Sequence, residues 1–310
     1  PGVLGAWQLG FLVLVLLVSL RGIHQGLARS LRVVVPLMLV LTLVLLAFAL
    51  SVGEPGPVIG RLLSLDFAAL GWHGLLQAMS QAFYSVGVAT GAMLMLGAYM
   101  PGSGSLRLAA WVVVVVDTLV AVLAAIVVYS LLHPLELNPG AGFSLLFNGL
   151  PLALSEGVSG SAATAQPMTS LLFVLVVLLA WSSAIIVLEP LVAWLMARTG
   201  LSRFLSVALL LVLIWVVGLG SILSFNHWSE ATFLGKGLFA WLNLLAAGVL
   251  MPLVGLGLAV FLGWVRPALL NRQGLVLGYP GFFIWQWLIR WLVPVVMVIL
   301  IIYAVWNFYA

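Results

Sequence analysis

The chain contains no cysteine among its 310 residues, and only 6% of its residues are charged. The missing thiols exclude disulfide bonds, cysteine-ligated metal centres and thiol catalysis. The scarcity of charge excludes an ordinary soluble domain, in which about 25% of residues are charged. Hydrophobic residues make up 65% of the chain, so the composition predicts an all-α polytopic membrane protein.

Eight apolar stretches are each long enough for a helix to cross a bilayer, which takes about 20 residues. We predict spans at 3–20, 33–52, 74–100, 106–132, 168–197, 202–224, 234–264 and 281–308. Between the fourth and fifth spans, an apolar piece at 143–154 is too short to cross and suits a re-entrant or capping helix. The sequence therefore predicts one transmembrane domain over residues 1–310, with residues 133–167 as its extracellular capping loop.

The basic residues gather on one side of this predicted topology. Eight of the 11 lysines and arginines lie in alternate loops: Arg21, Arg29, Arg32, Arg107, Arg198, Arg203, Arg266 and Arg272. The positive-inside rule makes that side cytoplasmic, so both ends of the chain face outward. Membrane topology thus explains the formal net charge of +4, and no nucleic-acid partner is expected.

The third predicted span, residues 74–100, is the least lipid-like of the eight. It contains the polar residues Gln77, Ser80, Gln81, Ser85 and Thr90. Its core, "SVGVATG", mixes glycine with β-branched residues, and both lower helix propensity. One interpretation is a broken helix between about Val86 and Gly91, whose non-helical backbone at membrane depth would line a cavity or bind a ligand. The alternative is a continuous helix whose small residues allow close packing.

Two other spans carry polar side chains near mid-membrane. Asp117 lies within "WVVVVVDTLVAVL", although a carboxylate at the centre of a bilayer costs on the order of 2.5–3.5 kcal/mol on insertion scales. Ser182 and Ser183 are adjacent in the fifth span. Together with the Ser85 region, these oxygen ligands suit a hard cation such as sodium. The alternatives are a protonated Asp117 hydrogen-bonded between helices, and serine hydroxyls that bond to the preceding turn.

Several stretches, in order along the chain, resemble the neurotransmitter:sodium symporter family, especially its bacterial leucine-transporter-type members. "RGIHQGLARSLRVVVPLMLVL" is similar to the end of the family's fourth helix and to its fifth, "QAFYSVGVATGAMLMLGAYMP" to the unwound sixth, and "VDTLVAVLAAIVVY" to the seventh. "FNGLPLAL" is similar to the extracellular capping loop, "WSSAIIVLEPLVAWL" to the eighth helix, and "LSFNHWSEATFLGKGLF" to the ninth-to-tenth region. The resemblance implies the five-plus-five inverted-repeat fold, of which this chain holds helices four to eleven. The first three helices are then expected before Pro1 or on a separate chain.

The same resemblance implies one substrate site and two sodium sites. It places Tyr84 as an aromatic lid, and the implied substrate-binding residues are Tyr84, Ser85, Gly87, Thr90, Ser183 and Val187. The implied sodium ligands are Ser85 and Asp117 at one site, and the Leu179 carbonyl, Ser182 and Ser183 at the other. Both serines of the fifth span are expected to face the protein interior. The charge of Asp117, beside Gln81, would replace the chloride ion that animal relatives hold.

Three positions depart from the family pattern. Gly87 and Thr90 stand where relatives often have a serine and a bulkier apolar residue, which implies a roomier and slightly more polar pocket. Asn243 replaces the acidic residue of the extracellular gate, so the ion pair of that gate is expected to be absent or changed. Glu189, next to Pro190, is interpreted as a structural residue that is paired or faces water.

These observations predict sodium-coupled symport of a small amino acid or related amine by alternating access. The protein is expected among the lipids of a plasma membrane, of the bacterial inner-membrane type. No enzymatic chemistry is implied, and the four histidines lack metal-ligand spacing. One alternative is a proton-coupled transporter in which Asp117 carries the proton. The other is a non-transporting membrane scaffold or partner subunit that keeps the fold.

Overall fold

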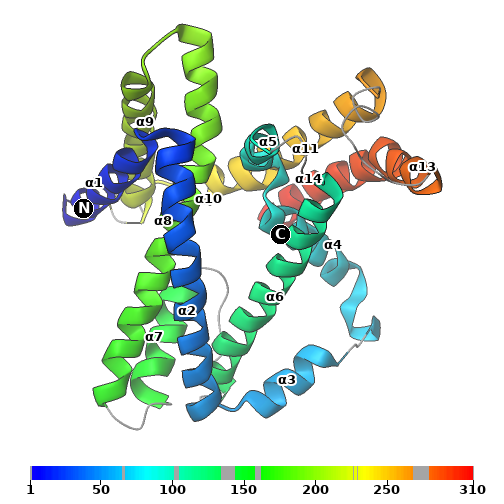
Figure 1. The fold of residues 1–310 in the computed structure, drawn as a ribbon. Coiled ribbons are helices and arrows are strands. Elements are labelled where there is room, and N and C mark those ends of the chain that lie inside the picture. The colour runs from blue at the N-terminus through cyan, green and yellow to red at the C-terminus, as the bar shows by residue number, and fades with distance from the viewer. Residues whose placement is uncertain are drawn as a thin grey trace. The chain divides into compact units, whose positions relative to one another are not determined.

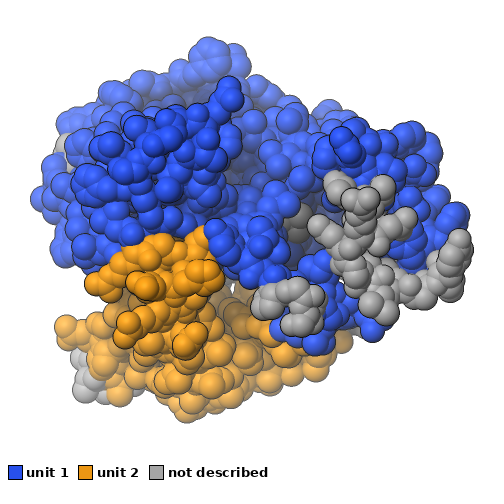
Figure 2. All heavy atoms as spheres, turned by 45° about the horizontal axis from the view of Figure 1, so that its top comes forward, with its two compact units in different colours: residues 1–20, 70–114, 186–310 blue, residues 21–69, 115–185 orange. Residues whose placement is uncertain are grey.

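The computed structural model describes residues 2–64, 67–100, 105–133, 144–157, 162–225, 227–228, 230–267 and 279–309. These residues are helical, apart from their turns and an isolated bridge between Phe233 and Lys236. The chain divides into two compact units, which we describe separately. Unit 1 comprises residues 1–20, 70–114 and 186–310, and unit 2 comprises residues 21–69 and 115–185 (Figure 2).

Seven of the described helical stretches are long and apolar enough to cross a membrane. They are Gly2–Ser19, Ile23–Val52, Leu106–Leu132, Thr164–Thr199, Arg203–Ser224, Leu238–Val265 and Gly281–Tyr309. Each overlaps one predicted span, because apolar runs of about 20 residues can satisfy their own backbone hydrogen bonds in lipid as helices. The remaining predicted span, 74–100, is helical on both sides of a break and is not among the seven.

The helices of the two units can be followed in Figure 1. Unit 1 contains α1 (Gly2–Ser19), α5 (Ala92–Ala98), α9 (Arg203–Ser224), α10 (Leu238–Asn243), α11 (Met251–Val260), α13 (Tyr279–Trp287) and α14 (Val293–Tyr309). Unit 2 contains α2 (Ala28–Val52), α3 (Pro55–Leu63) and α7 (Leu150–Leu152). Three helices continue along the chain from one unit into the other: α4 (Phe67–Val86), α6 (Leu106–Leu132) and α8 (Ala162–Thr199). Wider π-type turns adjoin several of them: η1 (Ile23–Leu27), η4 (Leu145–Gly149), η5 (Ala153–Gly157), η6 (Leu244–Leu250), η7 (Phe261–Val265) and η8 (Leu288–Leu292).

An apolar cluster between α2, α6, α7 and α8 forms the core of unit 2. Its buried members are Leu45, Ala49, Val127, Leu131, Leu132, Leu150, Ala153, Leu154, Leu172 and Leu175. The short apolar piece predicted at 143–154 contributes three of these through α7 and η5. Helical turns at Leu145–Gly157 therefore pack against the three long helices of this unit, because they bury their own apolar side chains there.

The ends of α2 and α6 also meet directly. The amide of Glu54 donates to the carbonyl of Ser130 at 3.2 Å, and a carboxylate oxygen of Glu54 lies 2.9 Å from Nδ1 of His133. Gly53 permits this approach, since a Cβ atom there would collide with the Ser130 carbonyl. A larger residue at position 53 would push the two helix ends apart.

In unit 1, α1 packs against α9 and α11 packs against α14. Nε2 of Gln8 donates to the carbonyl of Trp215 at 3.3 Å and ties α1 to α9. A Cβ atom added at Gly255 would lie 3.0 Å from Sδ of Met297 and 3.2 Å from the ring of Phe83. This glycine therefore lets α11 approach both α14 and the C-terminal part of α4.

The helix that contains the second predicted span begins before that span, which corrects the placement of Arg29 and Arg32 in a loop. η1 starts at Ile23 and passes directly into α2, whereas the apolar run predicted a start at residue 33. Arg29 and Arg32 consequently lie on a helix and not in a loop. The apolar run marks the part of a helix that lies in lipid, and the hydrogen-bonded backbone can continue beyond it into the interface.

Candidate functional site

The break predicted in the third span is confirmed. α4 ends at Val86, a short 3-10 turn (η2, Val88–Thr90) follows, and α5 begins at Ala92. Gly87 and Gly91, at the two ends of η2, have φ angles of 63° and 80°. These angles lie in the left-handed region that glycine adopts without a steric penalty. Two left-handed residues so close together end the regular helical hydrogen bonding, as the run of glycine and β-branched residues predicted.

The hydroxyl of Thr90 is used inside the break itself. Its Oγ1 donates to the carbonyl of Gly87 at 2.7 Å and accepts from the amide of Ala92 at 3.4 Å. A hydroxyl group has one proton to donate, so none remains for a ligand. The more polar pocket wall at Thr90 stays a prediction, because the hydroxyl proton serves the backbone while its oxygen keeps a second lone pair that can accept from a ligand.

Contacts on both sides of the break hold it within unit 1. The hydroxyl of Tyr84 donates to the carbonyl of Ala247, in η6, at 2.6 Å. Ser85 donates from Oγ to the carbonyl of Ala82 at 3.3 Å. A Cβ atom at Gly91 would lie 3.4 Å from Cβ of Pro190, so the break packs against α8. The role of Tyr84 as a lid stays a prediction.

The residues predicted for the second sodium site lie on α8. Ser182 is 6% exposed, and its Oγ donates to the carbonyl of Leu179 at 3.0 Å. This bond is the contact to the preceding turn that the sequence left open as an alternative, and it also brings two predicted ligand oxygens together. Ser183, the next residue, is exposed in the part of the chain that the structure describes, since neighbouring residues on a helix point about 100° apart. Its orientation toward the interior of a protein that includes the first three helices stays a prediction.

The predicted site residues divide between the two units. Unit 1 holds Gln81, Tyr84, Ser85, Gly87, Thr90 and Val187, and unit 2 holds Asp117, Leu179, Ser182 and Ser183. Asp117 lies in the middle of α6 and is partly exposed. Its predicted roles as a sodium ligand and as a substitute for chloride stay predictions. Asn243 is the last residue of α10.

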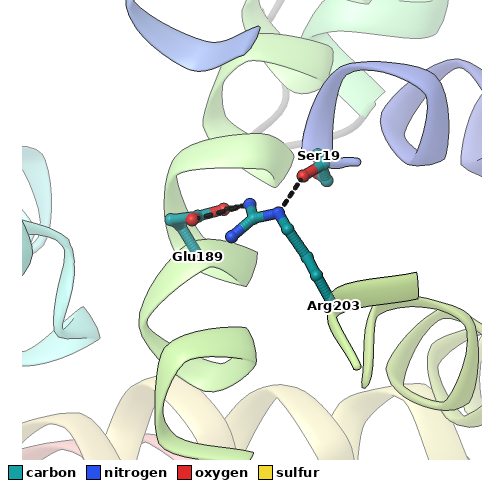
Figure 3. A network of polar contacts seen from close by, with 3 residues as sticks. All are labelled: Ser19, Glu189 and Arg203. Carbon is teal, nitrogen blue, oxygen red and sulfur yellow. Dashed lines mark hydrogen bonds and ion pairs between the residues drawn. The ribbon is translucent and has the colours of Figure 1, made fainter. Parts of the chain in front are cut away.

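A buried ion pair stands next to Pro190. Nη2 of Arg203 lies 2.7 Å from each carboxylate oxygen of Glu189, and Nε of the same arginine donates to the Ser19 carbonyl at 2.7 Å (Figure 3). The Glu189 side chain is 1% exposed and the Arg203 side chain 25%. The network joins the C-terminal end of α1, the interior of α8 and the N-terminal end of α9.

Glu189 is thus paired and structural, as the sequence indicated. The sequence analysis counted Arg203 among the basic residues of the cytoplasmic side and did not predict it as the partner of Glu189. The signal was present in the sequence. An acidic residue inside an apolar span needs a cation or a proton, and Arg203 follows 14 residues later, after a turn at Gly200.

Within the described residues, no group of three or more histidine and acidic side chains could hold a metal ion. His73 contacts the hydroxyl of Tyr303 at 3.3 Å, and His133 contacts Glu54. The candidate ligands are therefore serine and backbone oxygens with one carboxylate, a set that suits an alkali cation better than a transition metal.

Comparison with known proteins places these features in a family, although no protein-family model matches the chain. The chain is 24% identical over 300 residues to an uncharacterized sodium-dependent transporter of Haemophilus influenzae, and 26% identical over 298 residues to the uncharacterized sodium-dependent transporter YhdH of Bacillus subtilis. These matches cover 96% and 95% of the chain. The chain spans 64% and 65% of the length of these two relatives.

Among solved structures, the chain matches the crystal structure of MhsT in complex with L-phenylalanine, with a TM-score of 0.83 and 30% sequence identity. The match covers 97% of the chain and 68% of MhsT. It shows the leucine-transporter-type fold, all-helical and membrane-spanning, which the broken third span and the seven apolar helices also indicate. With this extent of structural and sequence agreement, the chain belongs to the neurotransmitter:sodium symporter family of sodium-dependent transporters.

Proposed function

We propose that the protein is a sodium-coupled symporter that carries an amino acid across a bacterial inner membrane by alternating access. The observation that carries this proposal is the break between Gly87 and Gly91. Irregular backbone at membrane depth supplies carbonyl and amide groups that a zwitterionic substrate and an alkali cation can bind. Membership of a sodium-dependent transporter family supports the same function.

Sodium is proposed to bind oxygen ligands on three helices. Ser85 and Asp117 are the proposed ligands of one ion, and the Leu179 carbonyl, Ser182 and Ser183 of the other. The bond between Ser182 and Leu179 supports the second set, because it holds a hydroxyl oxygen and a carbonyl oxygen 3.0 Å apart on one helix. Hard oxygen ligands of this kind suit a small hard cation such as sodium.

The substrate is proposed to be an amino acid with an apolar side chain. Gly87 has no side chain, and the hydroxyl of Thr90 is occupied by Gly87 and Ala92, so this part of the break offers space and a methyl group. Val187, 40% exposed on α8, adds another apolar surface. The L-phenylalanine bound to MhsT is an amino acid of this class.

Sodium-dependent binding tests the proposal. Radiolabelled phenylalanine, leucine, serine and glutamate are titrated against the purified full-length protein, in sodium chloride and in potassium chloride at equal ionic strength. We expect phenylalanine or leucine to bind more tightly in sodium, because two ligands that favour one state strengthen each other's binding. Affinity that follows pH and ignores sodium would support the proton-coupled alternative, and a protein that binds none of the four would support the scaffold.

A further inference from the structure

A hollow of about 600 Å³ lies on unit 2, where η1 passes into α2. It is lined by Arg21, His24, Gln25, Arg29 and Arg32, all of them exposed. We call it the basic pocket. Its chemistry is that of an anion site, because three arginines line one hollow and each guanidinium group carries N–H donors and a positive charge.

The arginines of the basic pocket are not neutralised by the part of the chain that the structure describes. The ion pair between Glu54 and His133 and the one between Glu189 and Arg203 include no arginine of the pocket. Like charges gathered at one site repel each other. A bound phosphate would relieve this repulsion, and its oxygens match the planar fork of arginine bidentately.

The surroundings of the basic pocket indicate the source of such a phosphate. Immediately after Arg32, α2 becomes apolar and exposes a strip of large side chains along one face: Val33, Leu39, Val40 and Leu43. A phospholipid whose headgroup occupies the pocket could lay its acyl chains along this strip. The positive-inside rule places the pocket at the cytoplasmic leaflet, where anionic lipids attract clustered arginines. A soluble phosphate ion has no acyl chains, so the strip would add nothing to its binding free energy.

We propose that the basic pocket binds the phosphate of an anionic phospholipid from the cytoplasmic leaflet, with the lipid's acyl chains against the exposed strip of α2. The lipid would thereby hold the junction of η1 and α2 at the membrane surface. This inference depends on the membrane topology and not on the transported substrate.

The test uses the full-length protein in an uncharged detergent and measures its thermal unfolding. The probes are dioctanoyl phosphatidylglycerol, dioctanoyl phosphatidylcholine and inorganic phosphate, each titrated separately. We expect phosphatidylglycerol to raise the unfolding temperature in a saturable way, and the other two to raise it little. Equal stabilisation by inorganic phosphate would overturn the lipid assignment, and equal stabilisation by phosphatidylcholine would overturn the anion site.

Matched variants locate the effect. Arg29→Gln with Arg32→Gln removes two charges from the basic pocket, and Arg198→Gln with Arg266→Gln removes two exposed cytoplasmic charges elsewhere. At about one kcal/mol for each arginine near an anionic surface, the pocket variant should bind phosphatidylglycerol on the order of 25-fold more weakly. The control variant should bind like the wild type. Equal weakening of phosphatidylglycerol binding in the pocket variant and the control variant would show non-specific electrostatic attraction and would contradict a specific site. If the pocket variant does not fold, Arg29→Lys with Arg32→Lys keeps the charge and should weaken binding by removing the bidentate fork.

Discussion

Removing either partner of the ion pair between Glu189 and Arg203 should destabilise the protein, and by unequal amounts. Arg203→Gln leaves the Glu189 carboxylate, 1% exposed, without its cation, and an unpaired buried charge costs about 3–5 kcal/mol. Glu189→Gln leaves an arginine that is 25% exposed and still bonds to the Ser19 carbonyl. Glu189→Gln therefore removes one charge-assisted contact, which should lower the stability by about 1.5–3 kcal/mol. The arginine variant should therefore be the less stable.

A double-mutant cycle measures this difference. The free energy of unfolding is determined by denaturant titration in mixed micelles for the wild type, both single variants and Glu189→Gln with Arg203→Gln. The double variant should recover about 1–3 kcal/mol relative to the sum of the single losses, because no uncompensated charge remains. Arg198→Gln, an exposed arginine on the last turn of α8, is the control and should change stability by less than about 0.5 kcal/mol. Equal losses in the two single variants, or strict additivity, would refute the assignment of the pair as a buried structural contact.

Three further predictions concern the break and Asp117. Gly91→Ala forces a side chain into a φ of 80° and should lower stability by about 1–2 kcal/mol in denaturant titration. Gly97→Ala, on α5 with open space around it, should be neutral or stabilising, and a similar loss there would contradict the strain. Thr90→Val removes the hydroxyl bonded to Gly87 and should lower stability by about 0.5–1.5 kcal/mol. The preference for apolar amino acids, measured in a competition assay, should stay unchanged. A changed preference would show that the hydroxyl contacts the substrate. Asp117→Asn should weaken sodium binding on the order of 10- to 150-fold. Chloride should restore part of the sodium affinity, because the anion would take over the lost charge beside Gln81. A variant that keeps wild-type sodium affinity in every anion would show that Asp117 is only a hydrogen-bonding group.

Much of the fold could be predicted from the sequence because lipid allows few solutions. A run of about 20 apolar residues must satisfy its backbone internally, so the seven long helices followed from hydropathy. The break followed from Gly87 and Gly91, since no other residue type adopts their φ angles easily. The beginning of α2 did not follow, because its first turns are polar and resemble a loop.

What the sequence could not show was which partner each polar group takes. The hydroxyl of Thr90 could have faced a ligand or the backbone, and only the path of the chain at Gly87 decides between them. The same holds for Arg203, whose partner Glu189 lies on the preceding helix. Exposure of Ser183 depends on the rotation of α8 about its axis, which a span with apolar residues on all sides does not specify.

Uptake driven by different ion gradients tests sodium-coupled symport most directly. Full-length protein is reconstituted into vesicles with an inward sodium gradient, an inward proton gradient or no gradient, and accumulation of labelled phenylalanine and leucine is followed. The account predicts that at least one of the two accumulates above its external concentration with the sodium gradient and only equilibrates without a gradient. Accumulation driven by the proton gradient alone, or none under any condition, would contradict it.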